Sequence, residues 1–452
     1  MMLRLVALVF FLNLISSLGF AQRFSNLENE KIQVAISELR KLEKSLGYSD
    51  YSLVEPLSEL ANLQTNIGSY AEANRSIDRA IQLIRRSGGL YTRDQLPYLR
   101  QKIENLATSG DWGNTREQME HINWFYLSKS AVTDMSLVDG LQHLSAMHLR
   151  GINEDFEVYQ SYHFRRAMDL QWSALRVARI NYGEKDERLI PIIYNLIKQY
   201  HLQRMAVEGG GSLGYQLRQY YPGSEWVRGR AETKDYFYYM GRRLLSQIAS
   251  IYAQSGEPIL ERLAMTGLYT ADWQTLFGRH EEALRTYNES YEQLESLYPE
   301  RTLILFQQPK LIPLDKFYES VGSALLAENY TEENLLVPDS KYQLSFEEWG
   351  NKFPHARRPD VLKPSNKSQA DRALFLFSLT GVDDIEDWVK TRKAQDFDRA
   401  IDAVLTGPKG FSEKEEEILE RRVQRLRFRP KLIEGLPQNA EILLEYRVAS
   451  RS

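Results

Sequence analysis

Residues 57–86 read LSELANLQTNIGSYAEANRSIDRAIQLIRR, and this stretch decides the fold of most of the chain. Apolar residues recur at helical spacing on both sides of Gly68, which marks a tight turn. After the turn, Ala73, Ile77 and Ala80 follow at steps of four and three residues and share one helix face. Small alanines on that face allow two helices to approach closely. The stretch therefore predicts a closely packed helical hairpin.

The hairpin resembles a tetratricopeptide repeat. Leu57, Leu60 and Ala61 match packing positions of the first helix of that repeat, whereas Gln64 stands where an aromatic residue is usual. The residues that match the turn and the second helix are Gly68, Tyr70, Ala73, Ile77 and Ala80. The resemblance implies stacked helical pairs with a concave groove for a peptide or a partner's helix. The polar positions that would line this groove are Glu55, Ser58, Asn62, Thr65 and Asn66. A solvated helix face would have the same composition.

The pattern returns along residues 26–300, which we expect to form one helical repeat domain. One copy has its turn at Gly110, followed by Thr115 and Met119. Another has Gly278 at the turn, with Ala283 and Tyr287 on the second helix. The steps between copies exceed the roughly 34 residues of the standard repeat. A generic helical bundle remains the alternative, since any amphipathic helix pair can carry alanines at such spacing.

Residues 207–239 interrupt this repeat pattern with three consecutive glycines and many aromatic residues. The aromatic residues that could line a pocket are Tyr220, Tyr221, Trp226 and Tyr236 to Tyr239. An enzyme of the cell envelope with its site in this insert is one alternative reading. The other is a loop between helices whose aromatic residues fill the core.

Residues 301–452 differ in composition from the helical part of the chain. Prolines are frequent over residues 301–366, which we expect to form a linker or lead-in. Residues 367–452 are expected to form a small α/β domain. Within it, residues 372–381 predict a buried strand, residues 396–405 (DFDRAIDAVL) a short helix, and residues 412–426 a helix with a capping box at its start.

Residues 427–448, RFRPKLIEGLPQNAEILLEYRV, predict a β-hairpin. Ile442, Leu444 and Tyr446 alternate with polar residues and would share one face of the last strand. Together with the preceding strand and helix, Arg427, Phe428, Pro430 and Gly435 make the region resemble the C-terminal domain of the energy transducer TonB. That resemblance implies binding of partner segments by strand addition, with Ile442, Leu444 and Tyr446 as candidate contacts. The hairpin could also serve only to close its own sheet.

Composition narrows the functional class. The chain has 452 residues, a formal net charge of −4 and no cysteine. The absence of a basic excess disfavours a nucleic-acid partner, and the absence of cysteine excludes disulfides and thiolate metal sites. Residues 1–21 have the layout of a secretory signal peptide, and we find no later apolar segment long enough to span a membrane. These features favour a bacterial periplasmic protein, although an uncleaved anchor would have a similar start.

No sequence motif points to catalysis. We find no metal-binding histidine pair, phosphate loop or nucleophile elbow, and we expect no cofactor, metal or catalytic residue. The sequence therefore predicts an exported scaffold or adapter that is not an enzyme. It would bind a protein or peptide partner through the helical groove and the terminal strand. Besides the envelope enzyme, the remaining alternative is an energy-transfer adapter to outer-membrane transporters.

Overall fold

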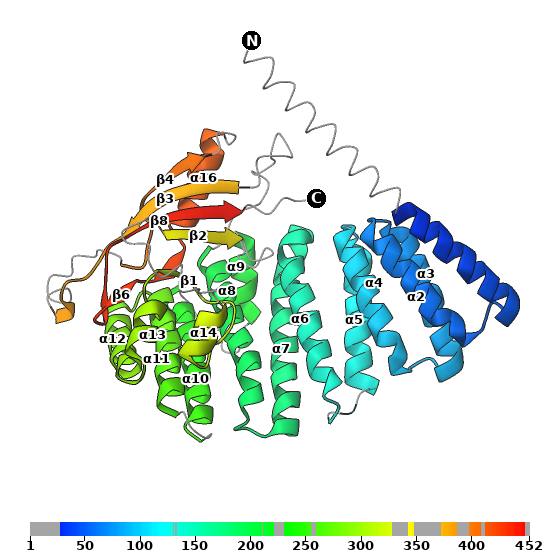
Figure 1. Ribbon diagram of the computed structural model, residues 1–452, viewed down its shortest axis with the longest axis horizontal. Helices are drawn as coiled ribbons and strands as arrows, with labels where there is room; N and C mark the ends of the chain where they lie inside the picture. Colours follow the sequence, from blue (N-terminus) through cyan, green and yellow to red (C-terminus); the bar gives the residue numbers. More distant parts are fainter. Residues whose placement is uncertain are drawn as a thin grey trace, which may run out of the picture. The chain divides into compact units, whose positions relative to one another are not determined.

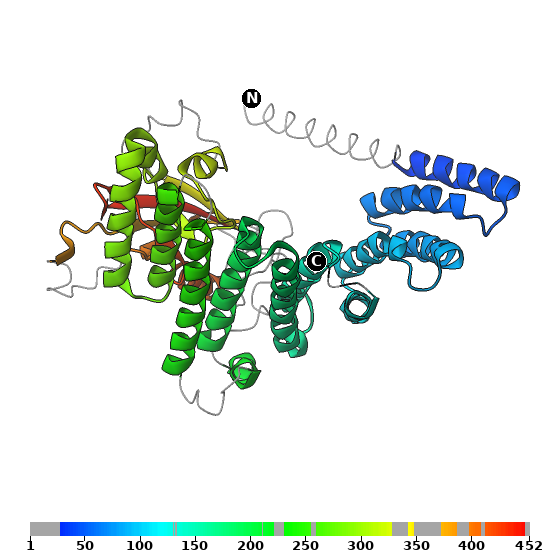
Figure 2. The same cartoon turned by 90° about the horizontal axis from the view of Figure 1, so that it is seen from below.

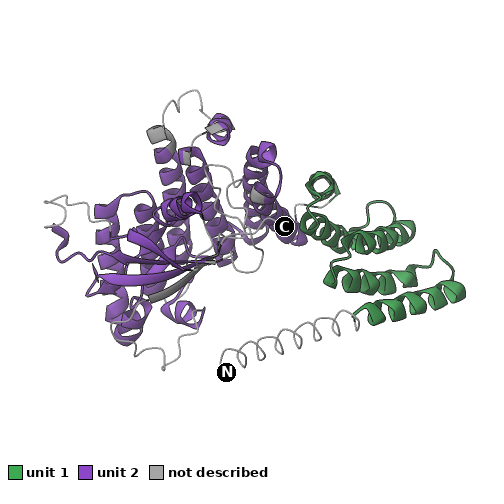
Figure 3. Cartoon of the chain, turned by 90° about the horizontal axis from the view of Figure 1, so that it is seen from above, with its two compact units in different colours: residues 1–131 green, residues 132–452 purple. Residues whose placement is uncertain are grey.

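The chain is mostly helical and carries a small sheet region near its C-terminus (Figure 1). The computed structural model describes residues 28–129, 131, 133–209, 211–220, 230–254, 259–327, 342–347, 372–386, 397–407 and 412–447. The expected signal peptide, Tyr221, Trp226 and half of the expected linker, residues 328–341 and 348–366, lie outside these residues. The chain divides into two compact units, residues 1–131 and 132–452, which Figure 3 distinguishes by colour.

The unit of residues 1–131 is built from paired helices. A helix over residues 28–46 is followed by η1 (Tyr51–Leu53), α2 (Val54–Asn66), α3 (Tyr70–Gly88), η2 (Arg93–Gln95), α4 (Leu96–Thr108) and α5 (Trp112–Lys129). Ala61 of α2 and Ala73, Ile77 and Ala80 of α3 have no exposed surface. These small side chains therefore lie in the interior where α2 and α3 pack, as the spacing of residues 57–86 predicts.

The turn at Gly68 has the same geometry at two other places in the chain. Gly68, Gly110 and Gly278 have φ values of 78°, 79° and 71°, a region that residues with a Cβ rarely adopt. At each turn the glycine N–H donates to the carbonyl three residues back, and the next N–H donates to the carbonyl five residues back. This pair of bonds satisfies the last carbonyls of the preceding helix. The same hydrogen-bonded glycine turn thus reverses the chain at three places.

A second turn recurs at the ends of longer helices. Gly47, Gly89 and Gly183 have φ values of 91°, 89° and 88°, and each donates its N–H to the carbonyl four residues back. A short 3-10 helix begins four residues after each glycine and leads into the next helix. Gly89 follows Gly47 by 42 residues, and Gly110 follows Gly68 by the same 42 residues. Helix–turn–helix units therefore alternate two types of turn.

Residues 132–452 begin with further antiparallel helices, which Figure 2 shows from below. The helices are α6 (Ser136–Glu154), η3 (Glu157–Tyr159), α7 (Gln160–Tyr182), η4 (Glu187–Leu189), α8 (Ile190–Gly209), α9 (Gly211–Tyr220), α10 (Arg230–Tyr252), α11 (Ile259–Leu276), α12 (His280–Leu297), α13 (Pro299–Leu305) and α14 (Val321–Ala327). Close contacts at glycines set their packing. At Gly267 of α11, a Cβ would lie 2.3 Å from Oγ of Ser290 on α12, so a larger residue would require this hydroxyl to move.

The strands form one four-stranded sheet and two short pairs. The strands are β1 (Lys310–Ile312), β2 (Tyr342–Glu347), β3 (Arg372–Leu379), β4 (Ile401–Gly407), β5 (Arg427–Arg429), β6 (Leu432–Ile433), β7 (Leu436–Pro437) and β8 (Ala440–Arg447). Helix α16 (Glu413–Val423) precedes β5 and begins with the expected capping box of Ser412 and Glu415. The order in the sheet is β2-β8-β3-β4, with β8 parallel to β2 and antiparallel to β3.

Two predictions for the terminal region are wrong. Residues 427–448 do not pair as one hairpin, because β5 pairs with β1 and β8 pairs with β2 and β3. The local turn between β6 and β7 is the only hairpin within this stretch as far as it is described. Residues 401–407 of the expected short helix form strand β4 beside β3. Spacing of apolar residues at three and four positions indicated a helix there, but long-range pairing with β3 decides the outcome.

The sheet region packs into the helical part of residues 132–452. One core cluster joins residues of α11, α12, α13 and α14 with Val382, Phe397 and Leu432. The buried guanidinium of Arg429 on β5 donates two hydrogen bonds to the carboxylate of Asp272 on α11, at 2.9 and 2.6 Å. Leu432 of β6 therefore shares a core cluster with the last helices, whereas β3, β8 and α16 contribute to a second cluster.

Candidate functional site

The polar face predicted to line a groove on α2 is largely used to bind α4. The amide of Gln101 donates to Oδ1 of Asn62 at 2.7 Å, and Thr65 donates to Oδ1 of Asn105 at 3.2 Å. Ser58 is hydrogen-bonded to Tyr98. Of the five predicted positions, Glu55, Asn62 and Asn66 are exposed. These contacts give Ser58, Asn62 and Thr65 a structural role between neighbouring helices.

The unexpected Gln64 also has a partner. Its Oε1 accepts a hydrogen bond of 2.9 Å from the hydroxyl of Ser76, and both side chains are buried. A buried polar group costs little when it is paired. The α2–α3 contact therefore uses this polar pair at the position where the repeat family usually has an aromatic residue.

A hollow lies on the other side of these helices, where α3 and α5 face each other across α4. We call it the α3–α5 groove, and it has a volume of about 250 Å³. Its lining residues are Asp78, Ile81, Arg85, Leu99, Lys102, Gln118 and His121. Ile81 and Leu99 give it an apolar floor, and Lys102 forms an ion pair of 2.5 Å with Asp78. Burial and the neighbouring charge of Arg85 lower the pKa of His121, which favours its neutral form.

Exposed apolar side chains lie at the C-terminal ends of α3 and α5. This surface, which we call the aromatic end, consists of Leu90, Tyr91, Trp124, Leu127 and Lys129. The first four are 56%, 47%, 44% and 62% exposed. The rings of Tyr91 and Trp124 lie 5.7 Å apart, and the Lys129 ammonium lies 4.4 Å from the Tyr91 ring centre and 5.7 Å from that of Trp124. His121 stacks on Trp124 at 6.3 Å, so the aromatic end continues the α3–α5 groove.

The sequence reasoning missed this surface, although a signal was present. Residues 124–127 read WFYL, and four consecutive apolar residues cannot all face one side of a helix. Phe125 and Tyr126 are buried, which leaves Trp124 and Leu127 outside. Two large apolar side chains on the solvent side of a helix are a recognisable mark of a contact surface.

The terminal strand does not offer the contacts that were predicted for it. Ile442 and Leu444 have no exposed surface, and Tyr446 is 1% exposed. Both edges of β8 are hydrogen-bonded, to β2 and to β3. These three residues therefore belong to the sheet core and are not available as partner contacts. Among the described strands, β2 and β4 lie at the two edges of the sheet, and Val404 on β4 is 56% exposed.

The aromatic residues described between positions 234 and 240 belong mainly to helix packing. Phe237 is fully buried, and its ring lies 6.2 Å from that of Tyr200. The backbone carbonyl of Tyr238 accepts a hydrogen bond of 3.0 Å from the indole of Trp273. Burial raises the pKa of Tyr238 to about 12, and its hydrogen bond to Glu282 adds to that effect. Tyr239, by contrast, is 63% exposed, so these rings do not converge on one site.

A larger hollow of about 420 Å³ lies where α6, α7 and α8 meet. Its lining residues are Met135, Ser136, Val138, Asp139, Gln142, Tyr182, Arg188, Pro191 and Ile192. The guanidinium of Arg188 lies 3.6 Å from the ring centre of Tyr182 and donates two hydrogen bonds to Asp186, both at 2.8 Å. Because Arg188 already donates these two hydrogen bonds to Asp186, it is less available to a ligand. This hollow is therefore a weaker candidate for a binding site than the α3–α5 groove.

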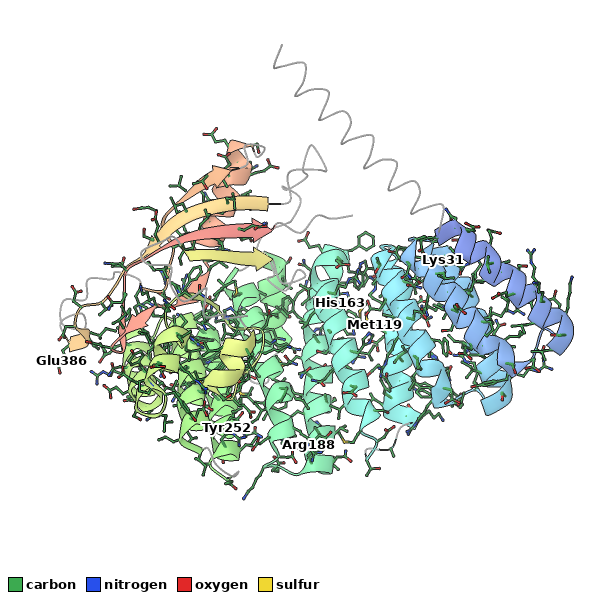
Figure 4. All side chains as sticks on the ribbon, in the orientation of Figure 1. Lys31, Met119, His163, Arg188, Tyr252 and Glu386 are labelled. Atoms are coloured by element: carbon green, nitrogen blue, oxygen red, sulfur yellow. The ribbon has the colours of Figure 1, made fainter. Side chains whose placement is uncertain are left out.

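Two histidines and an aspartate form a buried chain of hydrogen bonds between α6 and α7. Nδ1 of His148 lies 2.9 Å from Nδ1 of His163, and Nε2 of His163 lies 2.9 Å from the carboxylate of Asp155. Figure 4 labels His163, which is fully buried. Burial lowers the pKa of His148 well below its ordinary value, and the nearby charges of His163 and Arg166 lower it further. Burial and these neighbouring charges therefore favour an uncharged His148.

These shifts predict a loss of stability in mild acid. His201 is also buried, and its pKa is lowered well below the ordinary value by burial, Arg204 and Arg427. Unfolding returns both histidines to a pKa of about 6.5, so below that pH the unfolded chain binds more protons and is favoured. The free energy of unfolding should fall by up to about 1.4 kcal/mol per pH unit for each histidine. Urea unfolding at about pH 7.5 and about pH 5.5 measures this slope.

The variant His148→Gln should reduce this slope, because it removes one of the two buried histidines whose pKa is lowered. Equal slopes for His148→Gln and the unmodified chain would show that His148 is not the group that titrates on unfolding.

Comparisons with known proteins do not assign the chain to a family. No family model matches it, and no curated protein matches its sequence. Among the described residues, no helix is both long and apolar enough to cross a bilayer. In the same part of the chain, no three histidine or acidic side chains are grouped so that they could hold a metal ion.

Proposed function

We propose that this chain is an exported, non-enzymatic adapter that binds a protein partner on its helical unit of residues 1–131. The helices are proposed to form a tetratricopeptide-like stack, and residues 1–21 a signal peptide that directs the chain to the periplasm. The recurring turns at Gly68, Gly110 and Gly278 support the repeat proposal. Repeats of this kind bury their core between neighbouring units and leave their outer helix faces available to partners.

The single observation that carries the proposal is the continuous surface of the α3–α5 groove and the aromatic end. Most large apolar side chains on a helix face are buried against a neighbour, yet Trp124 and Leu127 are 44% and 62% exposed. Aromatic residues of this kind dominate the binding energy of protein interfaces. The proposal therefore places the partner on this face, and not on the α2–α4 face predicted from the sequence.

The resemblance of residues 367–452 to the TonB C-terminal domain stays a secondary proposal. Strand β3, helix α16 and the terminal strand β8 follow one another in the expected order. Strand addition would use one of the two edge strands of the described sheet, β2 or β4, because β8 is paired on both edges. The bulges in the β3–β4 register disfavour addition at β4, since an irregular edge pairs poorly with a new strand.

Affinity capture from the periplasm with single-site variants of the full chain tests the proposal. A version ending before residue 367 would be unsuitable, because it would remove Arg429 and Leu432 from a shared core. We expect Trp124→Ala to lose the captured partner, whereas Asn66→Arg on the α2–α4 face and Val404→Lys on the sheet edge retain it. Loss with Val404→Lys alone would instead favour the strand-addition proposal. Failure of the unmodified chain to retain any protein would contradict the adapter function.

A further inference from the structure

We infer that the α3–α5 groove and the aromatic end form a receptor for an acidic peptide segment with apolar or aromatic anchors. This inference rests on the proposed adapter function and names the chemistry of the partner. It follows from three observations: a surface held in place before binding, an excess of cations along it, and cationic groups without a carboxylate partner.

The loop that carries Leu90 and Tyr91 is fixed from beneath. Gln95 is 1% exposed, and its amide donates hydrogen bonds to the carbonyls of Leu90 at 2.9 Å and Thr92 at 2.8 Å. Its side-chain oxygen accepts a bond of 2.7 Å from Nε of Arg85. One buried side chain thus connects the loop to the wall of the groove. A surface that is ordered before binding loses less entropy when a partner arrives.

The charges along this surface are mainly positive. Arg85 and Lys102 line the groove, and Lys129 lies at the aromatic end. The one carboxylate in the groove lining belongs to Asp78 and is already in an ion pair with Lys102. Because His121 favours its neutral form, it adds little charge near neutral pH. The surface is therefore complementary to a negatively charged segment.

Two cations on this surface have donor groups available to such a segment. Among the described residues, the Lys129 ammonium contacts the faces of Tyr91 and Trp124 and no carboxylate. Arg85 uses Nε for Gln95, and in the same part of the structure its two terminal nitrogens have no hydrogen-bond acceptor. A guanidinium of this kind binds a carboxylate through paired hydrogen bonds.

The geometry assigns separate tasks to the two parts of the surface. Side chains of Phe or Leu from the peptide would lie on Leu90, Tyr91 and Trp124, while flanking carboxylates would reach Lys129 and Arg85. The cations lie near the C-terminal ends of α3 and α5. The helix dipole stabilises positive charge at such an end, so Lys129 and Arg85 are compatible with their positions. A neutral apolar peptide would gain the aromatic contacts alone and would bind more weakly.

Peptide binding to the full chain tests this inference. The probe is a fluorescein-labelled peptide of Asp and Glu flanking Phe and Leu, compared with a counterpart in which Asn and Gln replace the acids. Fluorescence polarisation gives the two Kd values. We expect the acidic peptide to bind about tenfold tighter than the amide peptide at low salt, and this preference to shrink as salt is added.

Variants locate the site. Trp124→Ala should weaken binding of the acidic peptide by about tenfold or more, as loss of an interface tryptophan commonly does. Lys129→Gln should reduce the preference for the acidic peptide over the amide peptide, because one of the two cations that would contact its carboxylates is lost. Tyr48→Ala is the matched control. Like Trp124, Tyr48 is an exposed aromatic residue in contact with a cation, and Arg79 lies 5.6 Å from its ring centre. Tyr48 lies outside this surface, so its loss should leave the Kd unchanged.

Equal affinities for the acidic and amide peptides would overturn the inference, as would an unchanged Kd for Trp124→Ala in a chain whose circular dichroism is unaltered. Either result would leave the adapter function intact if Trp124→Ala still abolished capture of the periplasmic partner. Loss of peptide preference together with failed capture by the unmodified chain would remove both proposals.

Discussion

The variant Arg429→Ala is expected to lower the free energy of unfolding by about 3–5 kcal/mol, because it leaves the carboxylate of Asp272 buried without its counter-charge. Arg429 is 2% exposed and Asp272 is 3% exposed. Burial by itself lowers the pKa of Arg429, but the adjacent Asp272 carboxylate outweighs it and raises the pKa above the ordinary value. Tyr287 also donates to Asp272, at 2.7 Å. Removing Arg429 therefore disturbs a connected buried network.

Urea unfolding followed by circular dichroism measures this effect. The control is Arg285→Ala, which breaks an exposed pair with Glu281 on α12 at 2.9 Å and should change stability by no more than about 0.5 kcal/mol. The double variant Asp272→Leu with Arg429→Met should recover much of the loss, since it removes both buried charges. A cost for Arg429→Ala no greater than that for Arg285→Ala would show that the pair does not hold the strands to the helices.

The helical turns could be predicted because their causes are local. Gly68 and Gly278 follow apolar helical patterns, and only a glycine readily adopts the positive φ that ends both helices. The alanines at positions 73, 80 and 283 were expected at helix contacts for their size, and all three are fully buried. Signals of this kind need only a few neighbouring residues, so a single sequence contains them.

Strand pairing could not be predicted in the same way, because it depends on distant segments. Phe428 on β5 pairs with Leu311 on β1, and Asp272 binds an arginine 157 residues later in the chain. The alternation of Ile442, Leu444 and Tyr446 correctly indicated one buried face. It could not show that both edges of the strand are paired, which is what removes these residues from contact with a partner.

The aromatic end could be predicted in part, because it depends on both local and distant features of the sequence. Exposure of Trp124 and Leu127 follows from the helical position of residues 124–127, which is local information. The meeting of Trp124 with Tyr91 depends on how α5 packs beside the loop after α3. The polar face of α2 was a reasonable first candidate for a groove, but Asn62 and Thr65 bind Gln101 and Asn105 of α4 instead. Sequence alone does not distinguish a polar side chain that binds a neighbouring helix from one that binds a partner.

The second large effect is expected from Gly151→Ala on α6, at a cost of about 3 kcal/mol or more. A Cβ at this position would lie 2.5 Å from Cε1 of the His163 ring, well inside van der Waals contact. His163 has no exposed surface and is held between His148 and Asp155, so its ring cannot move aside without breaking buried hydrogen bonds. Overpacking and the loss of these bonds act in the same direction.

Gly113→Ala on α5 is the matched control, because Gly113 is also helical but is exposed, with its nearest neighbour 3.7 Å from the position of a Cβ. Alanine favours a helix over glycine by about 0.8–1.0 kcal/mol, so this variant should leave stability unchanged or raise it slightly. The two midpoints in urea give the comparison directly. If Gly151→Ala behaved like Gly113→Ala, the close approach of α6 to His163 would be wrong, and with it the buried chain of hydrogen bonds that makes His148 sensitive to acid.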